Sequence, residues 1–176
     1  CSEEAKKSTP TTPLDSASLT NLIEIDATLP QEILPDRLFD VFDVPLLPTN
    51  LPGAMFDQGG RAVAASREQG FLCYGQYRTG YPGAPLRAVF SALIDNNTAG
   101  NEDILILDVY DRMSDLVLAQ RTVSRRDFLQ ANEYSLFEVN FIPPVGQYML
   151  EFRIYYLGWA YVRANKIAVI NPAQVS

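Results

Sequence analysis

Two alternating runs of apolar and polar residues near the C-terminus constrain the fold most. In the first run, Phe137, Val139 and Phe141 alternate with polar residues. In the second run, every other position from Tyr148 to Tyr156 is apolar. A period of two indicates a strand with one buried face and one solvated face. Because only residues such as Pro143 to Gly146 separate the runs, we expect them to pair as adjacent antiparallel strands.

Similar strand signals recur through the rest of the chain. Gly59 and Gly60 form a turn before a short strand, and further strands are predicted over residues 21–27, 70–78, 86–94, 104–110, 116–123 and 160–170. The even positions of 86–94 form an inward face, and 104–110 is apolar on both faces, which is typical of a central strand. In the last run the apolar parity changes, and a bulge near Asn165 and Lys166 reconciles its two halves.

These patterns predict one all-β domain. The chain has 176 residues, 47% of them apolar, which suits a single domain with a sizeable core. Long helical periodicity is missing, so the strands and turns favour an antiparallel β-sandwich. One helical turn is expected after Ser124, with Asp127 completing a capping box.

A proline-rich stretch covers residues 28–52. Proline cannot donate a hydrogen bond to a sheet, so this stretch cannot be a central strand. We expect an ordered loop that lies over the sandwich. Its apolar piece, Leu38–Val44, fits either a helical turn or an edge strand.

The first residues resemble a mature bacterial lipoprotein. Cys1 is followed by a tract rich in Ser, Thr and Pro. The resemblance implies an N-terminal lipid on Cys1, which anchors the chain to a membrane, and an extended tether over residues 1–19. The domain would then span 20–176 and lie in the cell envelope, on the periplasmic or outer-membrane/extracellular side. An arbitrary chain boundary is the alternative.

Charge and the missing histidine narrow the function classes. The net charge of −7 argues against nucleic acid as a partner. The chain has no histidine, which removes the commonest general base and metal ligand. We therefore expect no enzymatic activity, although catalysis by carboxylates alone stays open. Cys73 lies in an apolar run and is expected to be a buried thiol, with a Cys1–Cys73 disulfide as the alternative.

The order of several motifs resembles jelly-roll, galactose-binding-like carbohydrate-binding modules. The motifs are the Gly59–Val63 strand, Tyr74–Tyr77, the strand starting at Leu86 and the closing Lys166–Val169. The similarity covers roughly residues 20–171. It implies a jelly-roll-like sandwich and a glycan ligand.

In that family a structural calcium often lies between the first and last strands, and here Glu24 and Asn165 match its position. Calcium prefers several oxygen ligands, ideally charged ones. Asn165 replaces the usual acidic residue, which weakens the metal prediction. Gln76 also departs from the pattern, because proline is usual at its position.

Aromatic faces that stack on sugar rings, with a few polar groups beside them, are the expected glycan site. The candidates are Trp159, Tyr81, Tyr77, Tyr161 and Arg163. The alternative is that these rings fill or cover the sandwich core. The carboxylates around one turn, Asp108, Asp111 and Asp115, fit a solvated turn or, remotely, a glycoside hydrolase.

Three functions follow from these features. The preferred prediction is a lipid-anchored structural or adaptor subunit of an envelope assembly, with other envelope proteins as partners. It expects an ordered tail over residues 1–19 and a protein-covered loop over 28–52. The alternative is a carbohydrate-binding module for a surface or extracellular glycan. A hydrolase that uses carboxylates alone is the remote third.

Overall fold

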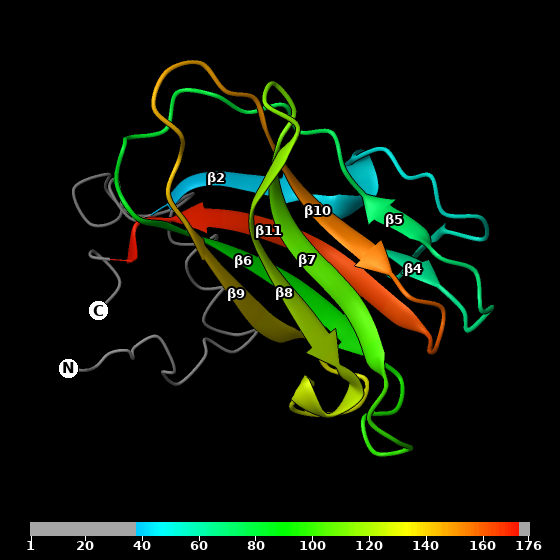
Figure 1. Cartoon of the computed structure of the whole chain (residues 1–176). Coiled ribbons are helices and arrows are strands. Elements are labelled where there is room, and N and C mark those ends of the chain that lie inside the picture. The colour runs from blue at the N-terminus through cyan, green and yellow to red at the C-terminus, as the bar shows by residue number, and fades with distance from the viewer. Residues whose placement is uncertain (1–37, 173–176) are drawn as a thin grey trace.

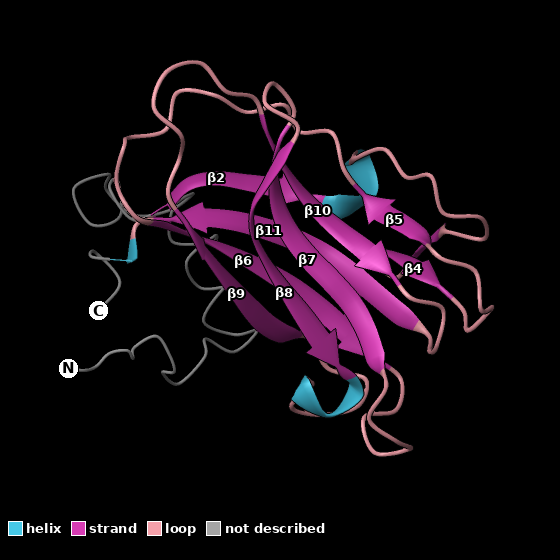
Figure 2. Cartoon of the chain, in the orientation of Figure 1, coloured by secondary structure: helices cyan, strands magenta, loops and turns pink. Residues whose placement is uncertain are grey.

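Strands and two short 3-10 helices make up the part of the chain that the computed structural model describes, residues 38–172 (Figures 1 and 2). The elements are β2 (Leu38–Asp43), η1 (Val44–Leu46), β3 (Met55–Asp57), β4 (Gly60–Val63), β5 (Gly70–Cys73), β6 (Leu86–Ile94), β7 (Asp103–Asp111), β8 (Leu116–Ser124), η2 (Arg125–Asp127), β9 (Ser135–Phe141), β10 (Leu150–Tyr156) and β11 (Val162–Ile170). Among these residues, no helix is long and apolar enough to cross a membrane.

The strands form two antiparallel sheets packed face to face (Figure 1). One sheet has four strands in the order β5-β10-β7-β8. The other has six, in the order β3-β4-β11-β6-β9, with β2 alongside β11. The predicted all-β, jelly-roll-like antiparallel sandwich is confirmed.

The core lies between the two sheets and follows the alternation of the sequence. The even positions of β6 from Leu86 to Ile94 face inward and are buried, as predicted. Opposite them, Phe152 of β10 packs its ring against Phe42, 5.8 Å between centroids, and against Phe141, 5.6 Å. β7 lies between β10 and β8, which confirms that it is a central strand.

The predicted hairpin of the two alternating runs is wrong. β9 pairs with β6, whereas β10 pairs with β5 and β7, so the two strands belong to different sheets. Residues 142–149 cross from one sheet to the other (Figure 1). Each of the two strands buries one face in the core between the sheets, and each faces the sheet that contains the other strand. Two strands of one hairpin would show the same alternation, so alternation alone does not distinguish the two arrangements.

Two local predictions are confirmed. The pairing of β11 with β6 shifts register between Ala164 and Lys166, where the bulge was expected. A 3-10 turn follows Ser124, whose backbone N–H donates to Asp127 Oδ2 at 2.9 Å.

The strand expected over residues 70–78 is shorter than predicted, because β5 ends at Cys73. Of the two alternatives for Leu38–Val44 within the expected loop over 28–52, the edge strand is confirmed, because β2 pairs along the C-terminal half of β11. The first strand expected at 21–27 and the tether lie outside the described residues. The thiol of Cys73 is free and buried, and burial raises its pKa to about 12.

Candidate functional site

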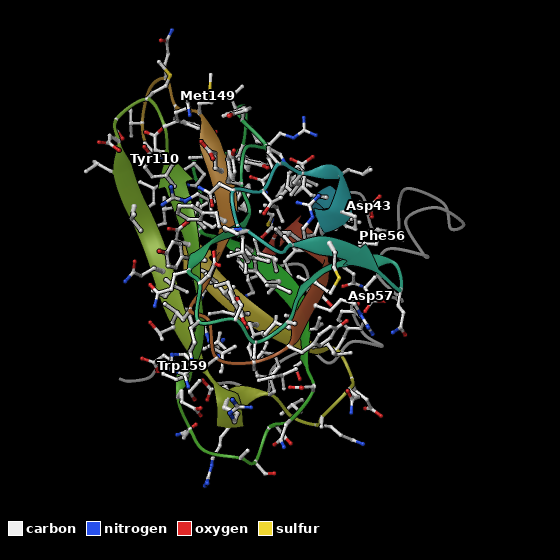
Figure 3. The ribbon with its side chains drawn as sticks, turned by 90° about the vertical axis from the view of Figure 1, so that its right-hand side faces the viewer. Asp43, Phe56, Asp57, Tyr110, Met149 and Trp159 are labelled. Carbon is white, nitrogen blue, oxygen red and sulfur yellow. The ribbon has the colours of Figure 1, made fainter. Side chains whose placement is uncertain are left out.

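The outward face of the four-stranded sheet carries a hollow of about 260 Å³. Its lining comes from β5, β7, β10 and the adjoining loops, and consists of Asn50, Phe71, Tyr74, Tyr110, Arg112, Glu151 and Arg153. Figure 3 shows Tyr110 and Met149 toward one end of the sandwich and Trp159 toward the other. The hollow therefore combines aromatic rings with charged and amide groups on one open surface.

Strand alternation and register bring the central side chains of this hollow together. In β10, Glu151, Arg153 and Tyr155 point away from the core, because Phe152 and Ile154 between them are buried in it. The register of β10 on β7 places Arg153 directly opposite Asp108. Directly opposed residues on one face of an antiparallel pair lie close enough for their side chains to interact.

Arg153 is held by two hydrogen bonds and two rings. Its Nε donates to Asp108 Oδ1 at 2.8 Å and its Nη2 to Oδ2 at 2.7 Å. Its guanidinium carbon lies 3.9 Å from the ring centroid of Tyr110 and 4.6 Å from that of Phe71. A planar guanidinium satisfies the carboxylate and stacks on rings at the same time, so Arg153 is fixed in place.

Burial and hydrogen bonding shift the pKa values of Asp108 and Arg153. Desolvation raises the pKa of the Asp108 carboxyl, and the hydrogen bonds from Arg153 oppose that rise. Burial is the largest influence on the pKa of Arg153 and acts to lower it, but the hydrogen bonds to Asp108 and the nearby charges, those of Asp108 and Glu151 above all, together outweigh burial and raise the pKa. Two bonds of the length typical of charged partners identify the pair as ionised.

A second carboxylate lies under the rim of the hollow. The Glu151 side chain is only 3% exposed, and its Oε1 accepts a hydrogen bond from Gly75 N–H at 2.9 Å. Its Oε2 lies 3.7 Å from Arg112 Nη1. The Arg112 side chain is 58% exposed and lies 5.4 Å from the ring centroid of Tyr77.

Gln76, which departs from the family pattern, extends the sheet beyond β5. Its Nε2 donates to the Phe152 carbonyl at 2.6 Å, and its Oε1 accepts from the Phe152 N–H at 2.7 Å. The side-chain amide thereby pairs with the edge of β10 where β5 has ended. Proline has no side-chain amide and could not make these bonds.

The structure does not bring the five glycan candidates from the sequence to one place. Tyr77 adjoins the hollow through Arg112. Tyr81 packs its ring against Phe152, and its hydroxyl donates to Asp40 Oδ2 at 2.6 Å. Burial is the largest cause that raises the pKa of Tyr81, which thus has a packing role.

The other three candidates lie elsewhere. Trp159 is 41% exposed in the loop between β10 and β11, where the Arg67 guanidinium lies 4.6 Å from its ring. Tyr161 and Arg163 lie near Asp57, on the opposite sheet, and the Tyr161 hydroxyl donates to Asp57 Oδ2. Arg163 Nη1 donates to the Tyr161 hydroxyl at 3.1 Å.

The carboxylates around the turn after β7 serve structural bonds. Asp111 Oδ1 accepts from the N–H of Met113 and of Met149, and its Oδ2 accepts from the Ser114 hydroxyl. Burial acts to raise the pKa of Asp111, but these hydrogen bonds outweigh it and the pKa is lowered. Asp115 accepts a hydrogen bond from the Tyr110 hydroxyl.

The calcium prediction stays a prediction. Glu24 lies outside the described residues. Asn165 lies at the β11 bulge, and its buried Oδ1 has no hydrogen-bond partner in the described part of the chain. Between residues 38 and 172, no group of three or more His, Cys, Asp or Glu side chains could hold a metal ion.

Sequence reasoning missed most of the hollow, above all Phe71, Tyr110 and Arg153, and it considered Asp108 only as one of the carboxylates around a turn. One signal was present, because the alternation of β10 marks Glu151, Arg153 and Tyr155 as its solvated face. The neighbours of that face come from strands far apart in the sequence, and alternation does not say which strands lie side by side.

No protein-family model and no curated protein matches this chain. Among solved structures, the chain is similar to the C-terminal CBM6 of LamC, a marine laminarinase from Zobellia galactanivorans, at 9% identity, with 75% of this chain and 98% of that chain covered and a TM-score of 0.49. It is also similar to a carbohydrate-binding module of Cellvibrio mixtus lichenase 5A in complex with cellotriose, at 8% identity, with coverages of 76% and 98% and a TM-score of 0.47. A third is a CBM36 module in complex with calcium and xylotriose, at 10% identity, with coverages of 74% and 99% and a TM-score of 0.47. The predicted resemblance to carbohydrate-binding modules is confirmed, and at these identities it concerns the fold alone.

The preferred functional prediction, a structural or adaptor subunit of an envelope assembly, is corrected. The solved structures named above are carbohydrate-binding modules. Of the two features that the subunit prediction expected, the ordered tail stays a prediction and the covering loop is in part a strand. Residues 1–19 lie outside the described residues, and residues 38–43 of the expected covering loop form strand β2 within the sheet.

Proposed function

We propose that this domain is a non-catalytic carbohydrate-binding module and that its glycan lies in the hollow on the four-stranded sheet. The observation that carries the proposal is a rigid arginine between two rings, Arg153 between Phe71 and Tyr110, on the wall of an open cavity. Glycan sites combine apolar ring surface with a few well-placed polar groups.

The hollow also offers hydrogen-bond donors that the protein itself does not use. Within residues 38–172, Arg153 Nη1, Asn50 Nδ2 and the Tyr74 hydroxyl donate no hydrogen bond, although all three residues line the hollow. Asn50 is held by its Oδ1, which accepts from Phe71 N–H at 2.7 Å. Donors that are already held in place bind sugar hydroxyls with a smaller loss of side-chain entropy.

The carboxylates of the hollow are poorly placed for hydrolysis. Both oxygens of Asp108 accept hydrogen bonds from Arg153, and the Glu151 side chain is almost fully buried. A hydrolase of this kind needs one carboxylic acid and one carboxylate that reach the scissile bond from two sides. This arrangement supports binding without catalysis.

The test is calorimetry and affinity electrophoresis on a panel of soluble glucans, xylans and acidic polysaccharides. Tyr110→Ala removes a ring of the hollow. Tyr134→Ala is its matched control, because Tyr134 also lies beside an arginine, Arg163, but on the opposite sheet. We expect Tyr110→Ala to weaken binding about tenfold, the loss of roughly one stacking contact, and Tyr134→Ala to leave it unchanged.

Two results would contradict this proposal. One is that the folded protein binds no polysaccharide of the panel. The other is that Tyr134→Ala abolishes binding while Tyr110→Ala, with an unchanged circular dichroism spectrum, retains it, which would move the glycan to the other sheet.

A further inference from the structure

We propose that the hollow recognises an acidic glycan, one whose sugars carry a carboxylate or another anionic substituent. This inference rests on the proposed function and names the class of its ligand. It comes from the charged side chains at the hollow: Arg112 and Arg153 line the cavity, whereas the side chains of Glu151 and Asp108 are only 3% and 8% exposed.

The carboxylates are almost inaccessible to a ligand. The Asp108 side chain is 8% exposed, and both of its oxygens are bonded by Arg153. The Glu151 side chain is 3% exposed and bonded by the Gly75 N–H. Their charges hold the arginines in place, but a ligand in the hollow meets their oxygens only at the edges.

The guanidinium groups, by contrast, keep donors for a ligand. Arg112 is more than half exposed, and its distance to Glu151, 3.7 Å, is longer than a charge-assisted hydrogen bond. Within residues 38–172 its guanidinium donates no hydrogen bond, while its backbone N–H is held by the Met149 carbonyl at 2.8 Å. Arg153 likewise keeps Nη1 for the cavity. A guanidinium fork suits a planar carboxylate, and Arg112 offers one at the hollow.

The net charge of the chain is negative, so the charge of the whole protein does not favour an acidic ligand. A protein of charge −7 repels polyanions in general. Attraction of an acidic glycan therefore needs an accessible positive group, and Arg112, which is more than half exposed, supplies one beside rings that stack on sugars. A neutral glycan would use the rings but would gain nothing from the Arg112 charge.

The experiment compares each acidic polysaccharide with its own neutral form. Polygalacturonate, alginate and glucuronoxylan are titrated beside their carboxyl-reduced forms, and dextran sulfate beside dextran. We expect an acidic form to bind about five- to tenfold more tightly than its neutral form, as for one charge-assisted hydrogen bond. The difference shrinks between about 50 mM and about 500 mM salt because screening weakens exposed ion pairs.

Variants assign the effect to the hollow. Arg112→Gln is expected to remove most of the preference for the acidic form, so that the variant binds the acidic and the neutral form of a polysaccharide about equally. Arg126→Gln makes the same change in net charge on η2, where Arg126 is exposed and its Nε donates to the Gly100 carbonyl. This control should keep the preference.

The possible outcomes separate the acidic-glycan inference from the proposed function. A preference confined to dextran sulfate keeps the anionic class and makes sulfate its source. Equal binding of acidic and neutral forms overturns the inference while the proposed function stands. A loss of preference in Arg126→Gln as large as in Arg112→Gln also overturns it, because net charge would then be the cause. If neither acidic nor neutral polysaccharides bind, the proposed function itself fails.

Discussion

The outer faces of the two sheets each carry an arginine among the same residue types. On the four-stranded sheet, Arg153 lies with Asp108 and Tyr110. On the six-stranded sheet, Arg163 lies with Asp57 and Tyr134. Both arginine side chains are mostly buried, so composition and burial alone do not separate the two clusters.

The clusters differ in what lies beside the arginine. Arg153 uses one fork on Asp108 and keeps Nη1 beside an open hollow. Arg163 donates from Nε to the Tyr134 hydroxyl at 2.9 Å and from Nη1 to Tyr161, with Asp57 at 3.8 Å. The second arginine ties a loop and two strands together. Within residues 38–172 each arginine leaves one Nη group without an acceptor, so the open hollow beside Arg153 is the feature that indicates a binding site.

The largest expected effect tests whether the Arg153–Asp108 pair holds the first cluster together. Arg153→Met leaves a buried carboxylate without its partner, and the free energy of unfolding should fall by about 3–5 kcal/mol. Adding Asp108→Leu removes the unpaired charge and should restore most of that loss. Urea unfolding of both variants measures this, and a double variant as unstable as the single one would contradict it.

The next effect tests whether the Arg163 cluster is closed by its neighbours. A Cβ on Gly60 would lie 2.7 Å from Arg163 Cγ and 2.9 Å from the Ala164 carbonyl oxygen. Gly60→Ala should therefore lower the free energy of unfolding by about 1–3 kcal/mol. Gly83→Ala is the control, since nothing lies within 4 Å of its added Cβ, and it should change stability by under about 0.5 kcal/mol. Equal stabilities of the two variants would show that the cluster is loosely packed.

A smaller effect depends on pH and concerns the turn that presents Arg112 to the hollow. The pKa of Asp111 is lowered in the folded protein, so its carboxylate stabilises the fold above the ordinary Asp pKa of about 3.9. That contribution is lost as the pH falls through the folded-state pKa. Asp111→Asn should cost about 1 kcal/mol near neutral pH. In thermal unfolding, the difference from the wild type should shrink as the pH falls below the ordinary Asp pKa and through the lowered folded-state pKa, and a constant difference would contradict the assignment.

The smallest effect concerns Trp159, a glycan candidate from the sequence. Trp159 lies in the loop between β10 and β11 and lines no part of the hollow. Trp159→Phe should change glycan affinity by less than about twofold and reduce stability only by part of its contact with Arg67, about 0.5 kcal/mol. Calorimetry with the best polysaccharide of the panel measures this. A tenfold loss would place the ligand at this end of the sandwich instead.

Much of the local structure could be predicted from the sequence. The inward face of β6, the central position of β7, the bulge at Asn165 and the turn capped by Ser124 all follow from alternation or capping within a few residues. These features depend on backbone geometry between close neighbours, and side-chain patterns report such geometry directly.

The site depended on contacts that no local pattern contains. Arg153 and Asp108 lie 45 residues apart, and Gln76 bonds Phe152 across 76 residues. For the same reason, the sequence wrongly predicted β9 and β10 as one hairpin. By itself, the sequence determined an all-β chain and which face of each strand is buried, because burial acts on each residue where it stands. Only the tertiary structure decided which strands are neighbours, since pairing is set by packing of the whole sandwich, and that choice alone puts an arginine, two rings and a hollow together.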